Sequence, residues 1–290
     1  MPRGVPKNGF RKTKKRMAAG FNPQLALAPV APVVERTEAE IRKDLNERFG
    51  ALGEMTHATV KGKNASMIVS GPAGVGKTFT IGEILSDNQK TVYSTVIKGY
   101  VRPTGLYKTL YEFRHPNCVV VFDDADSIFN DDVSLNILKA ACDTTKRRNL
   151  HWLTETKMED EDGERLPRSF QFEGSIIFVT NYDFDEMIAR GSKLAPHFEA
   201  LISRSHYLDL GMKTTADYVV RIKQVVQEHK MLRESGFSQA EEDTLLAFIC
   251  DNKNKLRELS LRMVLKLASL MRINPKNWQT LARTTCMKGA

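Results

Sequence analysis

The stretch that decides the fold is GPAGVGKT at residues 71–78, which directly follows the apolar run SMIVS at 66–70. It has the spacing GxxxxGK[ST] of a phosphate-binding loop between a strand and a helix. The glycines let backbone N–H groups close around phosphate oxygens, and the following helix presents its positive N-terminal end to the same group. The residues predicted to bind a nucleotide are Gly71, Pro72, Ala73, Gly74, Val75, Gly76, Lys77 and Thr78.

Two polar residues end this stretch, and two acids end a later strand. Lys77 is expected to pair with the β- and γ-phosphates of ATP, and the Thr78 hydroxyl to ligate Mg²⁺. The apolar run CVVVF at 118–122 is followed by Asp123 and Asp124. An acid at the C-terminal end of a buried strand can hold Mg²⁺ through water, so Asp123 is predicted to be the metal-side carboxylate. Asp124 is predicted to be the base that polarises the attacking water, which makes ATP and Mg²⁺ the expected cofactors.

Apolar strands and helical patterns alternate around this loop. Short, nearly continuous apolar strands separated by helices indicate a parallel sheet buried on both faces. The sequence therefore predicts an α/β fold, with a parallel sheet flanked by helices and a small four-helix domain after it. The strands are expected at 66–70, 91–97, 118–122, 175–180 and 205–209. Helices are expected at 37–50, which starts with a capping box, and near 214–231, 238–251, 256–272 and 276–285.

Composition divides the chain into three parts. Residues 1–34 combine basic residues with prolines and an alanine-rich stretch, and are predicted to be a disordered arm and linker. Residues 35–211 are expected to form the α/β core, with a hairpin insertion near 150–173. Residues 212–290 are expected to form the helical domain.

The amino-acid composition, with 41% hydrophobic and 27% charged residues, is typical of an ordinary soluble globular protein. No apolar run approaches the roughly 18 residues that cross a bilayer, and no apolar segment follows the basic N-terminus as in a secretory signal. No membrane contact is therefore expected. The four cysteines lie far apart without a CxxC pair, which argues against a zinc site or a disulfide framework and favours a reducing cytoplasm.

The net charge of +8 is concentrated at the two ends of the chain. Seven basic residues and no acid occur in the first sixteen positions, and nine basic residues with one acid follow position 251. Such segregation around an acidic centre suits contact with a polyanion, so DNA is an expected partner. The arm residues predicted to contact it are Arg11, Lys12, Lys14, Lys15 and Arg16.

Over about residues 50–285 the chain resembles the AAA+ superfamily of P-loop ATPases. The segments that carry the resemblance, in the family's order, are GPAGVGKT (71–78), VVVFDDAD (119–126), SIIFVTN (175–181), ALISRS (200–205) and LSLRMVLKLA (259–268). The resemblance implies a parallel sheet with the loop strand at its centre, followed by a four-helix lid. It also implies a ring or spiral homo-oligomer, expected to be a hexamer, with ATP at the subunit interfaces.

The resemblance also assigns roles to polar residues outside the loop. Asn181 looks like the first sensor, a polar group that touches the γ-phosphate or the attacking water. Arg204 looks like the arginine finger that completes the neighbouring subunit's site, with Arg190 as the alternative. Arg262 resembles the second sensor in the lid, with Arg257 as the alternative.

Two features distinguish this chain from many family members. Asp124 stands where many have Glu, and a carboxylate one methylene shorter slows hydrolysis or requires a shifted water. The runs at 150–154 and 169–172 flank an acidic turn at 159–162, which resembles the hairpin before the first sensor in helicases, unfoldases and enhancer-dependent activators. This compact architecture resembles phage and plasmid AAA+ ATPases, so the cytoplasm of a bacterial or phage-infected cell is the expected location.

The loop after the second predicted strand lies where AAA+ ATPases place their substrate-gripping loop. Tyr100 and Val101 after Gly99 resemble the aromatic–aliphatic pair of protein unfoldases, whereas Lys98 suits a phosphate backbone equally well. Three hypotheses follow. The preferred one is remodelling of DNA by a helicase, helicase loader or replication and recombination ATPase, because the ends are basic. The others are a protein remodeller and a switch that binds ATP, assembles and recruits a partner protein.

Overall fold

The computed structural model describes residues 36–154, 158–159 and 163–289. The predicted arm, with its candidate DNA contacts at 11–16, and the acidic turn residues 160–162 lie outside this part of the chain. None of the described helices is long and apolar enough to cross a membrane.

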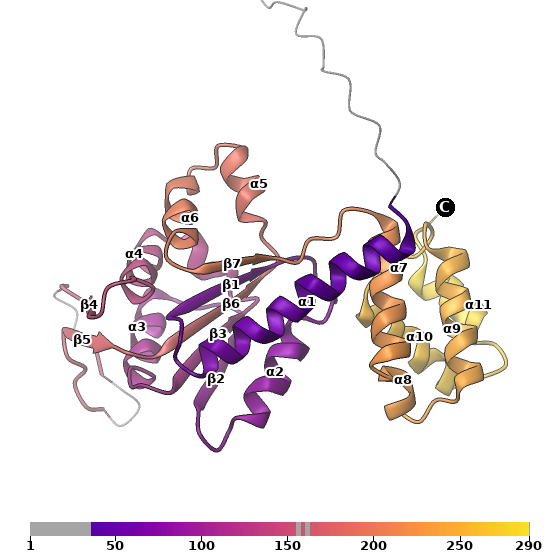
Figure 1. The fold of residues 1–290 in the computed structure, drawn as a ribbon, viewed down its shortest axis with the longest axis horizontal. Coiled ribbons are helices and arrows are strands. Elements are labelled where there is room, and N and C mark those ends of the chain that lie inside the picture. The colour runs from indigo at the N-terminus through magenta and orange to yellow at the C-terminus, as the bar shows by residue number, and fades with distance from the viewer. Residues whose placement is uncertain (1–35, 155–157, 160–162, 290) are drawn as a thin grey trace, which may run out of the picture. The chain divides into compact units, whose positions relative to one another are not determined.

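The main sheet consists of five strands: β1 (Ser66–Ser70), β2 (Tyr93–Lys98), β3 (Cys118–Asp123), β6 (Ser175–Thr180) and β7 (His206–Asp209). All of them are parallel, in the order β2-β3-β6-β1-β7 (Figure 1). The predicted parallel sheet is confirmed, and the predicted strands lie within two residues of these bounds. The expectation that the loop strand is central is wrong: β6 is central, because only β7 lies beyond β1.

Helices cover both faces of the sheet (Figure 1). They are α1 (Glu38–Val60), α2 (Lys77–Asp87), α3 (Pro103–Glu112), α4 (Asp132–Ala141), α5 (Phe184–Ala189) and α6 (Ala195–Ile202), with a 3₁₀ turn η1 (Asp126–Asn130) before α4. Alternate strand residues face opposite ways. Val119 and Val121 of β3 pack with α1 and α2, whereas Val120 and Phe122 pack with α3, α4 and α6. The inner strands β1, β3 and β6 are thus buried from both sides, whereas the edge strands β2 and β7 keep exposed residues.

The first helix is longer than predicted. The sequence suggested an end near Gly50, but α1 continues to Val60. The additional turns bury Leu52 and Thr56 against the sheet side of the core. Two glycines, Gly50 and Gly53, cost about 1 kcal/mol each in a helix interior, and burial of this apolar face outweighs that cost.

The hairpin before β6 is present as a separate two-stranded antiparallel sheet, β4 (Arg148–His151) and β5 (Ser169–Phe172). Its first strand ends three residues earlier than predicted. Phe170 packs edge-on against Tyr107 of α3 with ring centroids 5.0 Å apart, and Trp152 packs on the same tyrosine. The base of the hairpin is therefore part of the core.

The C-terminal region is helical, with its own apolar core. Its elements are α7 (Thr215–Lys223), a π-helical turn η2 (Gln224–Glu228), α8 (Met231–Glu234), α9 (Gln239–Asn252), α10 (Leu261–Ile273) and α11 (Trp278–Cys286). The predicted helical lid is confirmed, but two helix bounds were wrong. The first helix gives way to the π-helical turn, after which Lys230 has a φ of 53°. The third begins at Leu261 rather than near 256, because Leu256 pairs with Met287 and Ser260 caps α10. The domain boundary at 211/212 stays a prediction.

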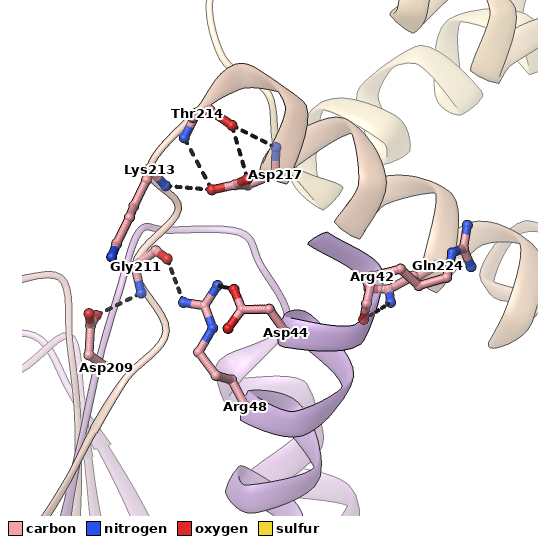
Figure 2. Close-up of polar contacts among 9 residues, drawn as sticks. All are labelled: Arg42, Asp44, Arg48, Asp209, Gly211, Lys213, Thr214, Asp217 and Gln224. Atoms are coloured by element: carbon pink, nitrogen blue, oxygen red, sulfur yellow. Dashed lines mark hydrogen bonds and ion pairs between the residues drawn. The ribbon is translucent and has the colours of Figure 1, made fainter. Parts of the chain in front are cut away.

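The segment between β7 and the lid is tied to α1 (Figure 2). Gly211 donates its N–H to Asp209 Oδ1 at 2.7 Å, and its carbonyl accepts from Arg48 Nη1 at 2.6 Å. The other terminal nitrogen of Arg48 donates to Asp44 Oδ2 at 2.8 Å. One arginine of α1 thereby holds the connection between the sheet and the lid.

The start of α7 is fixed by a buried carboxylate (Figure 2). Asp217 accepts hydrogen bonds from the backbone N–H groups of Lys213 at 2.8 Å and Thr214 at 3.1 Å, and from the Thr214 hydroxyl at 2.9 Å. Further along, Gln224 donates to the Arg42 carbonyl of α1 at 3.3 Å. The lid therefore contacts α1 just after the last residue of its first helix.

Replacing Arg48 by Ala should lower the free energy of unfolding by about 1–3 kcal/mol, because the Gly211 carbonyl and Asp44 lose a charged donor. The measurement is urea unfolding followed by circular dichroism. Lys43→Ala on the exposed side of the same helix, where Nζ lies 4.0 Å from Glu47, is the matched control and should change stability by less than about 0.5 kcal/mol. Equal effects of the two changes would contradict this role of Arg48.

Candidate nucleotide site

The loop at 71–76 connects β1 to α2 and lies against the start of α10. Gly74 and Gly76 have φ values of 73° and 104°, which favour glycine. A Cβ on Gly74 would lie only 2.8 Å from the Cβ of Ser260. The N–H of Leu261 donates to the Gly74 carbonyl at 2.7 Å. The loop and the lid are therefore in direct backbone contact.

Lys77 is buried at the first turn of α2. Its ammonium donates to the carbonyls of Gly71 and of Pro72, the latter at 3.0 Å, and to Asn181 Oδ1 at 3.1 Å. Burial lowers the pKa of the ammonium to about 8, and the carboxylates that follow β3 oppose this shift. The group is a desolvated cation held by neutral oxygens, and a phosphate is a stronger acceptor for it.

Oxygen ligands suited to Mg²⁺ lie beside this lysine. The Thr78 hydroxyl donates to Asp123 Oδ1 at 2.8 Å, and Lys98 Nζ lies 2.9 Å from Asp123 Oδ2. Within the described residues, no group of three or more His, Cys, Asp or Glu side chains could hold a metal. Mg²⁺ commonly binds to one or two protein oxygens together with substrate phosphates, so Thr78 and Asp123 fit that kind of site.

Asp124 is held in an unusual backbone conformation. Its φ of 53° is uncommon for a residue with a side chain, although Asp and Asn tolerate it best. Its N–H donates to the Val179 carbonyl of β6 at 3.0 Å. Its carboxylate accepts from Asn181 Nδ2 at 2.9 Å and lies 4.0 Å from Arg262 Nη2. Such strained residues are concentrated at functional sites, and this carboxylate is exposed where a water could reach it.

A cavity of about 690 Å³ connects these groups. Its lining includes Lys77, Asp124, Asn181, Arg262 and Leu265, from both the sheet and the lid. That volume is in the range of small-molecule sites. The lining combines charged and polar groups with apolar lid residues, which suits a ligand that has both phosphates and an aromatic base.

A family model described as "ATPase family associated with various cellular activities (AAA)" matches residues 67–195. A relative in Enterobacteria phage T4, an uncharacterized 36.7 kDa protein in the nrdC-mobD intergenic region, is 37% identical over 251 residues. The match covers 86% of this chain and 76% of the relative. The chain belongs to the AAA+ ATPase family. Nucleotide binding is typical of this family, so the cavity is the candidate nucleotide site.

Two solved structures resemble this AAA+ chain at low identity. The RuvB Holliday junction branch migration motor of Thermotoga maritima is 14% identical, with 86% of this chain and 69% of that chain covered and a TM-score of 0.45. Domain III of the replication initiation protein DnaA of Thermotoga maritima is 10% identical, with 83% and 93% covered and a TM-score of 0.47.

Arg204, the candidate arginine finger of this AAA+ chain, lies away from the chain's own loop. It donates to the Ala200 carbonyl at 2.8 Å at the end of α6. The next residue, Ser205, shares a 2.8 Å hydrogen bond with Ser66, the first residue of β1. The loop follows the last residue of β1, about 13 Å away at roughly 3.3 Å per residue.

The two alternative arginines are placed differently from the preferred ones. Arg190 pairs with Glu186 on its own helix α5. Arg257 lines a second hollow of about 460 Å³, whereas Arg262 lines the nucleotide cavity and approaches Asp124. Geometry therefore favours Arg262 over Arg257 as the lid arginine at the site.

Only part of the candidate substrate loop, residues 98–101, is exposed and without contacts to the rest of the described core. Tyr100 is 78% exposed, while Val101 is half-buried and packs on the core. Lys98 points to Asp123, which was not expected for a residue predicted to contact substrate. Of the three candidates, Tyr100 is the one most available to a partner.

Arg221 was missed by the sequence interpretation. It is buried, its Nε donates to the Val75 carbonyl of the loop at 3.1 Å, and its guanidinium lies 3.4 Å from the ring centroid of Phe49. Burial lowers its pKa to about 10. The available signal was a lone arginine within the apolar run YVVRI at 218–222, on the face of the helix that packs inward.

Gly74→Ala should weaken ATP binding at least about tenfold, because the new Cβ overlaps Ser260 and the backbone conformation disfavours a side chain. Titration calorimetry with ATP measures the effect. Gly82→Ala in α2, where a Cβ meets nothing within 4 Å, is the matched control and should leave binding unchanged. Equal affinities of the two variants would contradict the close contact between loop and lid.

Proposed function

We propose that this AAA+ chain binds ATP with Mg²⁺, hydrolyses it to ADP and phosphate within a homo-oligomeric ring, and uses the resulting movement to remodel DNA. The observation that carries the proposal is the convergence of Lys77, Asn181, Asp124 and Arg262 around the loop. A cation, an amide, an acid and a lid arginine then face the same phosphate end of the cavity.

The chain's own residues have separate tasks in this mechanism. Lys77 and the loop N–H groups bind the phosphates. Thr78 and Asp123 would hold Mg²⁺, and the bound ion would supply positive charge to the phosphate oxygens. Asp124 accepts a proton from the water whose oxygen attacks the γ-phosphorus, while the bond from that phosphorus to the β-phosphate oxygen breaks and ADP leaves. Asn181 holds the Asp124 carboxylate in place through its 2.9 Å hydrogen bond.

The position of Arg204 supports action between subunits. It lies near the start of β1, whereas the loop follows the end of that strand, so it does not serve its own chain's nucleotide. In a head-to-tail ring, one face of each subunit meets the opposite face of the next. Arg204 is proposed to reach the neighbour's γ-phosphate, and a hexamer is the expected ring.

Mixing two inactive variants tests this arrangement. Arg204→Ala should bind ATP normally but lose about 10³-fold in turnover, and Asp124→Asn, which keeps a side chain that tolerates the left-handed backbone, should be as inactive. In an equal mixture about a quarter of the sites combine an intact Asp124 with an intact neighbouring Arg204, so about a quarter of wild-type ATPase should return. Arg190→Ala is the control and should stay active. A mixture without recovered turnover would remove Arg204 from this role.

Charge in the lid supports DNA as the substrate. A short backbone pairing joins residues 255–257 to 286–288, through Lys288 N–H to the Lys255 carbonyl and Arg257 N–H to the Cys286 carbonyl. It brings together exposed basic residues, which we call the lid cluster: Lys253, Lys255, Arg257 and Lys288. The nearby acid Glu258 is neutralised by Lys266 at 2.8 Å. Closely spaced cations of this kind bind phosphate backbones without reading sequence.

A protein remodeller is the second candidate function, and the exposed side chain of Tyr100 favours it. Aromatic side chains on a loop can hold an extended polypeptide by apolar contact. The lid cluster has no comparable use in that function, which is why DNA is preferred.

The phage T4 relative supports a place of action in the cytoplasm of an infected bacterial cell. This agrees with the expectation from the cysteines, which the structure leaves as free thiols.

ATPase rates separate the two functions. Turnover is measured alone, with single-stranded DNA, with duplex DNA and with an unfolded protein, at low and moderate salt, with Lys77→Ala as the inactive reference. Stimulation by DNA that fades with salt is expected. If ATP turnover rises with the unfolded protein but not with DNA, protein remodelling becomes the favoured function.

The same preparation tests the lid cluster. The double change of Lys253 and Arg257 to Ala should reduce the slope of log affinity against log salt by about 1.4–1.8, since each lost phosphate contact contributes about 0.7–0.9. The double change of Lys276 and Arg283 to Ala removes the same charge from the same domain and should not alter the slope. Deletion of residues 1–16 measures separately how much the N-terminal arm contributes to the slope of log affinity for DNA against log salt.

A further inference from the structure

Lys98 connects the substrate loop directly to the metal-side acid. It is the last residue of β2 and lies in register with Asp123, the last residue of β3. Its ammonium is 2.9 Å from Asp123 Oδ2, while Oδ1 of the same carboxylate accepts from Thr78. The Asp123 side chain is 4% exposed and that of Lys98 is 62% exposed. This buried acid thus has one oxygen facing Thr78 in the first turn of α2 and the other facing a solvent-exposed cation.

The residues after Lys98 form a short segment between two anchors. Gly99 has a φ of 85° and open space around it, and Tyr100 is mostly exposed. Val101 is anchored by Ser127, whose hydroxyl accepts from the Val101 N–H at 2.9 Å and donates to its carbonyl at 3.4 Å. Ser127 lies in η1, four residues after Asp123. Lys98 is therefore the anchor that depends on a charge, and Ser127 is the neutral one.

We propose that Lys98 is a positioning residue that couples metal binding at Asp123 to the position of the Gly99–Tyr100 segment. The coupling rests on the proposed function, in which Mg²⁺ binds through Thr78 and Asp123. Two cations near one carboxylate repel each other, so the ammonium and Mg²⁺ compete for Asp123. When the metal is bound, Lys98 leaves Oδ2, and the segment with Tyr100 is released at that end while Val101 stays attached to Ser127.

The direction of the competition distinguishes this role from a merely structural ion pair. If Lys98 competes with the metal, its removal must lower the Mg²⁺ concentration needed for ATP binding. If Lys98 only stabilises the end of β2, or if it helps to hold phosphate, its removal leaves that concentration unchanged or raises it. Because Lys98 is largely exposed, solvent screens the pair and the expected change is moderate.

The experiment compares Lys98→Met, which keeps the apolar stem without the charge, with the wild type and with Lys90→Met. Lys90 is an exposed lysine in the turn before β2. Titrating Mg²⁺ at fixed fluorescent ATP analogue should give a half-saturating concentration roughly three- to fivefold lower for Lys98→Met, and unchanged for Lys90→Met. Hydrogen exchange of residues 99–100 is the second readout. It should rise on Mg²⁺ addition in the wild type and be high with or without Mg²⁺ in Lys98→Met.

The outcomes separate this inference from the function on which it rests. A half-saturating Mg²⁺ concentration that is unchanged or higher in Lys98→Met overturns the coupling, as does a wild-type response of residues 99–100 in that variant. Both outcomes leave the ATPase proposal standing. Nucleotide binding by the wild type that is indifferent to Mg²⁺ overturns both.

Discussion

The burial of the Lys77 ammonium is the constraint on which the arrangement of the site depends. A desolvated cation requires acceptors and nearby negative charge. Its acceptors are the loop carbonyls after β1 and Asn181 after β6. The compensating carboxylates are Asp123, the last residue of β3, and Asp124, which follows it. These strands are neighbours in the order β3-β6-β1, so the strand order of the sheet is what allows this lysine to be buried at all.

The parts of the fold that could be predicted are those encoded by neighbouring residues. The loop spacing at 71–78 requires a strand before it and a helix after it, and both are present. Apolar runs predicted the parallel strands because a sheet covered on both faces needs no polar alternation. Asp123, Asp124 and Asn181 were predictable as site residues because parallel strands deliver their C-terminal ends to one edge. Their catalytic roles, and those of Arg204 and Arg262, remain predictions.

Features that depend on contacts between distant residues could not be predicted from local pattern. Nothing near Lys98 indicates that its ammonium reaches Asp123, because that contact follows from the register of β2 on β3. Arg221 reaches the loop carbonyl of Val75 across 146 positions of sequence. The end of α1 was placed near Gly50 because a glycine usually weakens a helix, whereas packing against the sheet decides the outcome there.

The π-helical turn at 224–228 sets a limit on how this lid can evolve. Its wider turn lets Gln224 and Glu228 both reach Arg42 of α1, while Val226 lies in the lid's apolar core. Loss of one residue here would rotate all the following chain by about 100° about the helix axis. Both the attachment to α1 and the placement of Arg262 against Asp124 would then change together. A change in the number of residues between α7 and α8 is therefore expected to disturb the site more than a change in the identity of residues on the outer surface of the lid.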